Sequence, residues 1–414
     1  MVTVKPFKAL RPREDLANLC AALPYDVMSS KEAREMVKGN PYTFLRIDRA
    51  EVNLPTDVDI YSKEVYETAK ATLNKMENDG VYINDSEKKY YFYRQIMNGH
   101  AQTGIVGCAS IDDYLENRIK KHEFTRADKE IDRINHVDYC SAQTGPIFLT
   151  YKDSKALDEI IEKQTQGAPI YDFVAEDGVQ HTVWTTDGEK TDKEIEKAFN
   201  SLDALYIADG HHRCASAVKV GVKRREANKN HTGNEEYNFF LSVIFPSKSL
   251  AILDYNRLLK DLNGYTPKAL LEIIEEKVGQ VSLFEGEGPY KPTEKHTVGI
   301  YLDNKWYKVK FHESICMAEK AVDRLDCAIL QKHLLSAILG IDDPRSDKRI
   351  DFAGGIRGLE YLEKRCHEDM QMAISMYPTS LDDLMAVADN GDVMPPKSTW
   401  FEPKLRSGLL IHKI

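Results

Sequence analysis

Short apolar runs of strand length alternate with helix-like patterns along the whole chain of 414 residues. Residues 90–96, 103–111 and 238–246 are rich in β-branched and aromatic side chains, which favours strands. Residues 60–79 instead carry apolar side chains at helical spacing and stop at Gly80. Because the two patterns are mixed throughout, we predict an α/β or α+β fold.

The length of the chain suggests more than one domain, since domains hold roughly 150 residues. The pattern changes after about residue 250, where a new group of helices and strands begins. We therefore predict a first domain over residues 1–250 and an additional α+β domain over residues 251–414.

Charge limits the partners that the sequence favours, and cysteine content indicates the compartment. The chain has 56 basic and 66 acidic residues. The resulting net charge of −10 argues against a surface that binds DNA or an anionic membrane. The apolar runs are too short to span a bilayer, and the first residues hold no apolar signal core. The 7 cysteines form no CxxC pair, which is typical of reduced thiols. We expect a cytoplasmic protein.

The most informative motif is an Asp-Gly-His-His-Arg sequence between a strand and a helix. Gly210 allows a tight turn and close approach of a ligand, and amides at a helix N-terminus bind anions. Arg213 can hold phosphate with two parallel hydrogen bonds. His211 and His212 can donate to phosphate or relay a proton, and Asp209 can bind Mg²⁺ or orient a histidine. A capped helix start with surface histidines is the simpler alternative, but the combination favours a site.

A second candidate segment is basic within this acidic chain. In a helix over residues 125–141, Arg126, Lys129 and Arg133 share one face. Lys120, Lys121, His122 and Glu123 come directly before it. His122 or Glu123 can serve as a general base, and the cations can hold a phosphate or carboxylate. A solvated helix face with ion pairs is the alternative.

A third segment, residues 394–409, is rich in proline, aromatic and basic residues. Lys397, Ser398, Thr399 and Lys404 resemble phosphate donors. The alternative is a tail that Trp400 and Phe401 fix to the surface, and the sequence does not decide between the two.

Several blocks, in order, resemble the domain of unknown function 1015 family, whose members carry ParB-like or SpoOJ-like labels. The blocks are VKPFKALRP, PYDVMS, KHEFTRADKEIDR, IADGHHRCASA and MPPKSTWFEPKLRSGL. The resemblance covers nearly the whole chain. It implies a mixed sheet like that of ParB and sulfiredoxin, with a further C-terminal domain.

The turn at residues 209–213 is also similar to the phosphate-binding turn of the ParB/sulfiredoxin superfamily. Free-serine kinases of that superfamily carry a DGHxR turn, so the resemblance implies a nucleotide at this place. It also implies a glutamate base, for which Glu123 is the nearest analogue at a different spacing. Sulfiredoxin-like chemistry requires a cysteine before the His-Arg pair, whereas Cys214 follows it. We expect Cys214 to be a buried structural thiol.

These observations lead to a predicted phosphotransferase that acts on a small hydroxy amino acid, serine or phosphoserine, in either direction. A ParB-like nucleotide switch without turnover is the alternative. We expect ATP, ADP or another phosphate compound as ligand, and Mg²⁺ on Asp209; a homodimer stays open. The catalytic candidates are Glu123, His122, Asp209, His211 and His212. The phosphate-binding candidates are Gly210, Arg213, Lys120, Lys121, Arg126, Lys129, Arg133, Lys397, Ser398, Thr399 and Lys404.

Overall fold

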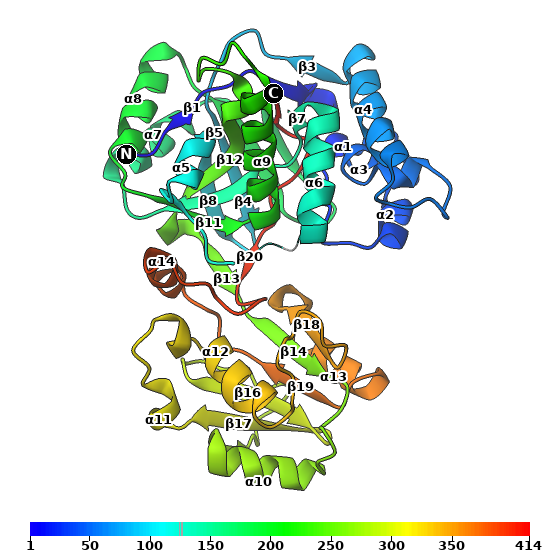
Figure 1. Cartoon of the computed structure of the whole chain (residues 1–414), viewed down its shortest axis with the longest axis vertical. Helices are drawn as coiled ribbons and strands as arrows, with labels where there is room; N and C mark the ends of the chain where they lie inside the picture. The colour runs from blue at the N-terminus through cyan, green and yellow to red at the C-terminus, as the bar shows by residue number, and fades with distance from the viewer. Residues whose placement is uncertain (124, 126) are drawn as a thin grey trace. The chain divides into compact units, whose positions relative to one another are not determined.

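The computed structural model describes residues 1–123, 125 and 127–414, except for the side chain of Asp128. Its contacts divide the chain into two compact units, and both contain helices and sheets (Figure 1). The mixed α+β fold predicted from the sequence is therefore confirmed.

The boundaries of the two units differ from the single boundary near residue 250 that the sequence predicts. Unit 1 consists of Met1–Lys121, Thr125–Leu250 and Pro403–Ile414. Unit 2 consists of Ala251–Glu402 together with His122 and Glu123. The sequence assigned the last residues to the second domain, whereas the contacts place Pro403–Ile414 in unit 1.

A nine-stranded sheet forms the centre of unit 1. In order its strands are β6 (Ile119–Lys120), β11 (Leu205–Asp209), β8 (Ile147–Tyr151), β12 (Phe239–Pro246), β5 (His100–Ser110), β4 (Tyr91–Met97), β10 (Gln180–Thr185) and β9 (Tyr171–Val174), with β1 (Val4–Lys5) also on β5. Strands β12 and β8 are parallel, and β11 and β8 are antiparallel. The main apolar core lies around this sheet and includes fully buried residues of β8, β11 and β12.

Helices and a second sheet complete unit 1. Helix α9 packs on β8 and β12, α6 packs on α9, and α4 packs on α6 (Figure 1). A four-stranded sheet runs β3 (Tyr82–Asn84), β2 (Ala9–Pro12), β21 (Ile411–Lys413) and β7 (Ala142–Gln143). The helices are α1 (Ala17–Cys20), α2 (Ser30–Met36), α3 (Leu45–Asp48), α4 (Lys63–Asn78), α5 (Ile111–Leu115), α6 (Ala127–Cys140), α7 (Lys155–Gln164), α8 (Glu189–Asn200) and α9 (His211–Ala227).

Unit 2 is built on a six-stranded sheet of its own. Its order is β15 (Gly279–Leu283), β17 (Lys305–Phe311), β16 (Thr297–Leu302), β19 (Met372–Ser375), β14 (Tyr255–Leu259) and β18 (Ile350–Gly354), and β13 (Ala251–Leu253) pairs with β20 (Trp400–Glu402). Its helices are α10 (Pro267–Lys277), α11 (Glu313–Cys316), α12 (Asp326–Leu330), α13 (Glu360–Glu368) and α14 (Leu381–Asp389). A π-helix, Gln331–Ser336, continues α12. Among the described residues, no helix combines the length and apolar character that crossing a bilayer requires.

Local sequence patterns located several elements well. The predicted hairpin forms, since β4 and β5 pair across a turn with Met97 opposite His100. The helix predicted over residues 60–79 is α4. The helix predicted from Cys214 instead begins at His211, directly after Gly210. His211, His212 and Arg213 therefore lie in the first turn of α9 and not in a preceding loop.

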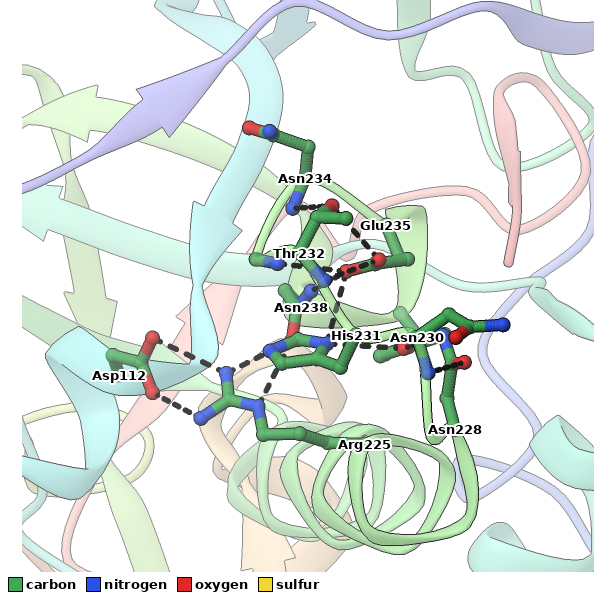
Figure 2. A network of polar contacts seen from close by, with 11 residues as sticks. Asp112, Arg225, Asn228, Asn230, His231, Thr232, Asn234, Glu235 and Asn238 are labelled. Carbon is green, nitrogen blue, oxygen red and sulfur yellow. Dashed lines mark hydrogen bonds and ion pairs between the residues drawn. The ribbon is translucent and has the colours of Figure 1, made fainter.

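A polar network fixes the far end of α9 (Figure 2). Arg225 donates two hydrogen bonds to the carboxylate of Asp112 in α5, at 2.8 and 3.2 Å, and two more to Asn238. Glu235 accepts from the amides of Thr232 and Gly233 in the loop after the helix. These bonds, two of them to a carboxylate, hold the end of α9 against α5 and against the residues that precede β12.

The segment Pro403–Ile414 places charged side chains among the other residues of unit 1. Arg406 donates from Nε to Nε2 of His181 at 3.2 Å and also pairs with Asp177. The other ring nitrogen of His181 bonds the hydroxyl of Tyr93 at 2.7 Å. Burial and the charge of Arg406 lower the pKa of His181 to about 3. The imidazole is therefore neutral at physiological pH, and Nδ1 carries its proton.

The neutral state of His181 predicts how acid affects unit 1. The folded pKa of His181 lies below the value of about 6.5 of an unfolded chain, so the unfolded state binds more protons between these pH values. Its contribution to stability is complete above pH 6.5 and falls as pH drops toward 3, by up to about 1.4 kcal/mol per pH unit. We expect His181→Gln to flatten the decline in the free energy of unfolding between pH 6.5 and 4. The exposed His100, changed to Gln, should leave the slope as it is.

Close packing at Gly221 in α9 gives a second prediction. A Cβ at this position would lie 2.4 Å from the carbonyl oxygen of Tyr237 and 2.9 Å from Ile111. We expect Gly221→Ala to lower the free energy of unfolding by about 1–3 kcal/mol despite the better helix propensity of alanine. Gly167→Ala is the matched control because no atom lies within 4 Å of its Cβ. Equal urea midpoints for the two variants would contradict the packing.

Candidate functional site

The Asp-Gly-His-His-Arg motif forms a tight junction between β11 and α9. Gly210 has a left-handed backbone, with φ +90° and ψ 33°, and occupies the N-cap position of α9. This conformation costs a residue with a Cβ about 1–2 kcal/mol. Glycine avoids that cost, which explains its presence at position 210. The turn directs the first amides of a 17-residue helix away from the sheet, where they favour a negatively charged ligand.

The side chain of Arg213 folds back over this turn. A Cβ on Gly210 would lie 3.1–3.3 Å from its Nε, Nη2 and Cζ atoms, and a Cβ on Gly145 would lie 3.4 Å from Nη1. Nη1 donates to the carbonyl of Pro146 at 2.6 Å. Within the described part of the chain, Nε is buried and has no hydrogen-bond partner. The guanidinium is thus fixed in place with donor capacity to spare.

Asp209 joins the turn to the C-terminal segment. Its Oδ1 accepts from the amide of Gly210 at 2.8 Å, and its Oδ2 accepts from Nζ of Lys404 at 3.0 Å. Burial opposes ionisation, but the charges of Lys404 and Arg213 outweigh it and hold the pKa of the Asp209 carboxyl well below its usual value. Asp209 is therefore an anion that positions two cations at the turn.

A cavity of about 30 Å³, lined in part by Arg213, lies within unit 1. Several residues that sequence reasoning did not select line it. The lining residues that the sequence did select are Arg133 and Arg213. The others are Tyr25, Asp48, His136, Val137, Gln143, Thr144, Gly145, Ile147 and Ala217. The only sequence signals were indirect, since Tyr25 lies in the PYDVMS block and His136 follows Arg133 by three residues on one helix.

Arg133 is buried at the wall of this cavity. It donates from Nε to Asp132 at 3.0 Å, and its guanidinium lies 4.0 Å from the ring centre of Tyr25. Burial disfavours its charge, but Asp132 and Tyr25 outweigh burial and raise the pKa of Arg133. The sequence predicted one helix face shared by Arg126, Lys129 and Arg133, and the structure buries Arg133.

Asp48 and His136 also line the cavity. Asp48 is 4% exposed and accepts a hydrogen bond from the hydroxyl of Thr144 at 2.7 Å. Nε2 of His136 lies 3.1 Å from the carbonyl of Ile47 and 3.9 Å from Asp48. Burial, and then the charge of Arg133, lower the pKa of His136. This histidine is neutral at pH 7 and donates to Ile47.

The other basic candidates lie at separate places in unit 1. Nζ of Lys120 is 5.8 Å from the ring centre of Tyr206, and Nζ of Lys121 is 4.4 Å from that of Tyr114. Lys129 donates to the hydroxyl of Tyr61 at 3.1 Å. Arg126 lies outside the described residues. Lys129 thus contacts Tyr61, whereas Arg133 is buried beside Tyr25.

The histidines of the motif and the candidate base belong to different units. His211 is buried. Burial opposes ionisation of Glu130, but Lys219, the hydroxyl of Thr125 and, to a smaller extent, His212 outweigh burial and lower the pKa of Glu130. His122 is buried in unit 2, where its carbonyl accepts from the amide of Met394 at 2.8 Å. Glu123 belongs to unit 2 as well. The part of His122 and Glu123 in catalysis stays a prediction from the sequence.

The Lys-Ser-Thr segment also belongs to unit 2, apart from Lys404. Ser398 is 8% exposed and donates to the carbonyl of Pro395 at 2.6 Å, while its oxygen lies 3.1 Å from Sγ of Cys327. Nζ of Lys397 lies 5.5 Å from the ring centre of Tyr255. The hydroxyl of Ser398 is thus engaged in local structure, and Lys404 is the residue of this segment that contacts the turn.

The predicted magnesium site on Asp209 does not fit the structure. Both oxygens of this carboxylate already accept hydrogen bonds, one of them from an ammonium group. Among the described residues, no cluster of three His, Cys, Asp or Glu side chains can hold a metal. We therefore assign no resident metal, and Mg²⁺ would enter only with a nucleotide as part of the substrate.

The contact between Gly210 and Arg213 yields a prediction. Gly210→Ala adds backbone strain and pushes the guanidinium, whereas Gly39→Ala adds strain at φ +74° with no atom within 4 Å. We expect Gly210→Ala to lower the free energy of unfolding more than Gly39→Ala, by about 1 kcal/mol. Arg213→Ala should remove this excess in a double-mutant cycle measured by urea unfolding. An excess that survives without Arg213 would show that the contact is not its cause.

Comparisons with known proteins place the chain in a family. The model of the family described as protein of unknown function (DUF1015) matches residues 4–328. No curated protein matches the chain.

Solved structures that align with it include SbnI with a C-terminal truncation from Staphylococcus aureus. That pair has 9% identity and a TM-score of 0.40, and the alignment covers 74% of this chain and 87% of that one. A free serine kinase mutant in complex with AMP has 15% identity and a TM-score of 0.37, covering 73% and 90%. A conserved hypothetical protein from Pyrococcus furiosus has 15% identity and a TM-score of 0.35, covering 73% and 93%. These scores are too low to bear on activity. Because the family model spans most of the chain, the protein belongs to the family DUF1015.

Proposed function

We propose that the protein is a phosphotransferase that moves a phosphoryl group to or from the hydroxyl of serine. In one direction the serine Oγ attacks the terminal phosphorus of a nucleotide, the bond to the bridging oxygen breaks, and the hydroxyl proton passes to a base. In the other direction water or a nucleoside diphosphate takes the phosphoryl group from phosphoserine. Both directions demand the same positioning and charge neutralisation.

The observation that carries the proposal is the fixed guanidinium of Arg213 over the Gly210 turn. Its Nη1 atom is held by the carbonyl of Pro146, and its Nε atom has no partner among the described residues. A phosphate oxygen can accept from this arginine and from the amides that begin α9. Because the donors are fixed before the ligand arrives, they cost little reorganisation when charge develops on the phosphoryl group.

Lys404 adds a second cation whose position is set by Asp209. The ion pair keeps the ammonium at the turn, where its positive charge favours a bound phosphate. The resemblance of residues 209–213 to the turn of free-serine kinases supports the same reading. Glu123 remains the proposed base, and Glu123→Gln tests it separately.

The test is a paired assay on the full chain with magnesium. Serine is incubated with ATP, ADP or pyrophosphate, and phosphoserine with and without ADP, and both amino acids are followed by mass spectrometry. We expect interconversion that Arg213→Ala reduces by roughly 10²–10³-fold. Lys193→Ala is the control, because this lysine is exposed on α8 and pairs with Glu189.

Two outcomes would overturn the proposal. Wild-type turnover in a folded Arg213→Ala variant would remove the site assignment. A wild-type protein that shows no interconversion, while ADP raises its melting temperature, would favour the nucleotide switch and direct the search to a protein partner.

A further inference from the structure

Helices α6 and α9 lie side by side in unit 1 (Figure 1). Early in both helices, the hydroxyl of Ser216 in α9 donates to the carbonyl of Glu130 in α6 at 3.1 Å. Later in both, Nζ of Lys223 in α9 donates to the carboxylate of Asp138 in α6 at 2.6 Å. Because the contacts advance along both helices together, α6 and α9 run in the same direction. The start of α6 therefore lies beside the start of α9, where the phosphate turn is.

One face of α9 is directed at α6. Ser216, Lys219 and Lys223 each bond a residue of α6, and they recur at intervals of three and four residues. His212 precedes Ser216 by four residues, so it belongs to the same face of the helix. Helical spacing thus directs His212 toward the beginning of α6, one turn closer to the phosphate turn than Ser216.

Glu130 supplies a buried carboxylate at this place. It is 6% exposed; one of its carboxylate oxygens pairs with Nζ of Lys219, and the other accepts from the hydroxyl of Thr125 at 2.7 Å. Thr125 precedes α6, so the carboxylate is held toward the N-terminal end of its own helix. Burial opposes ionisation of Glu130, but Lys219, Thr125 and also His212 lower its pKa, as expected if the imidazole is a neighbour.

A carboxylate beside an imidazole favours the protonated ring, in which both nitrogens are donors. An isolated histidine is mostly neutral at pH 7. The side chain of Lys219 is 61% exposed, so water screens its competing charge. The other charged or titratable groups near the start of α9 are Asp209, His211, Arg213, Lys121 and Lys404. Most of them are cations, so a positive charge on His212 requires the compensation that Glu130 gives.

We propose that Glu130 is a positioning residue of the phosphate turn, and that its carboxylate holds the imidazole of His212 as a positively charged donor to the bound phosphate. The inference rests on the proposed phosphotransferase function, to which it adds a third cation beside Arg213 and Lys404. Phosphoryl transfer depends chiefly on such neutralisation of charge. The proposed role of Glu123 as the base is unchanged.

Nuclear magnetic resonance of the histidine rings in the full chain measures the charge of His212 without any turnover. The signals lost in His212→Gln identify this ring. In Glu130→Gln we expect the titration midpoint of His212 to fall by about half a pH unit or more, because an amide does not favour the imidazolium. Lys219→Met should raise the midpoint, since it removes a cation and leaves the carboxylate of Glu130 in place.

Asp138→Asn is the matched control. Asp138 also joins α6 to α9, through Lys223 and Arg224, but it lies two turns further from the phosphate turn. This variant should titrate at His212 like the wild type. If Glu130→Gln does not fold, the exposed Lys219→Met decides the question. A midpoint that does not respond to the change at Glu130 or at Lys219 overturns the inference.

Calorimetric titration with ADP at pH 7 shows whether the charge of His212 reaches the phosphate. We expect Glu130→Gln to weaken ADP about threefold or more, and to have no further effect in a His212→Gln background. An equal loss with and without His212 would overturn the positioning role, as would a wild-type protein that does not bind ADP.

The transfer assay on the same proteins separates this inference from the proposed function. Responses of the His212 midpoint and of ADP affinity to Glu130→Gln, without transfer in the wild type, support the role of Glu130 at a phosphate site and overturn the phosphotransferase. Transfer by a wild-type protein whose His212 does not respond to Glu130 supports the phosphotransferase and overturns the role of Glu130.

Discussion

The placement of one guanidinium group constrains much of unit 1. Arg213 packs closely over Gly210, where a Cβ would lie 3.1–3.3 Å from its guanidinium atoms, and it donates to the carbonyl of Pro146. These contacts join the start of α9 to the residue that precedes β8. Arg213 lies at the turn and also lines the small cavity. A change in backbone at any of the three positions would therefore alter both places together.

Several largely buried cations of unit 1 pair with a carboxylate, and two of these carboxylates come from a distant segment. Lys404 meets Asp209, Arg406 meets Asp177, and Arg133 meets its neighbour Asp132. Desolvation offsets much of the attraction within such pairs, so they add less to stability than their number suggests. Their effect is on geometry, because a buried charge that loses its partner is strongly unfavourable. The pairs thus fix which segments meet at the site.

Sequence reasoning located the turn because its signal is local. A strand, a glycine and a helix with an arginine in its first turn lie within a few residues, and propensity alone defines them. Helical spacing put Arg133 on one face with Arg126 and Lys129, but it did not reveal that Tyr25 covers the guanidinium of Arg133. Asp48 and Thr144 gave no signal, since their contact joins residues 96 positions apart. Such long-range pairs depend on the topology of the sheet.

The return of Pro403–Ile414 to unit 1 has a consequence for synthesis of the protein. Domains generally fold in order as the ribosome makes them, yet here the first unit contains the last strand of one sheet and Lys404 of the turn. Nearly all of unit 2 is made before these residues emerge. A nascent or truncated chain therefore lacks the cation that accompanies Asp209. The order of translation thereby keeps the site incomplete until residue 404 has left the ribosome.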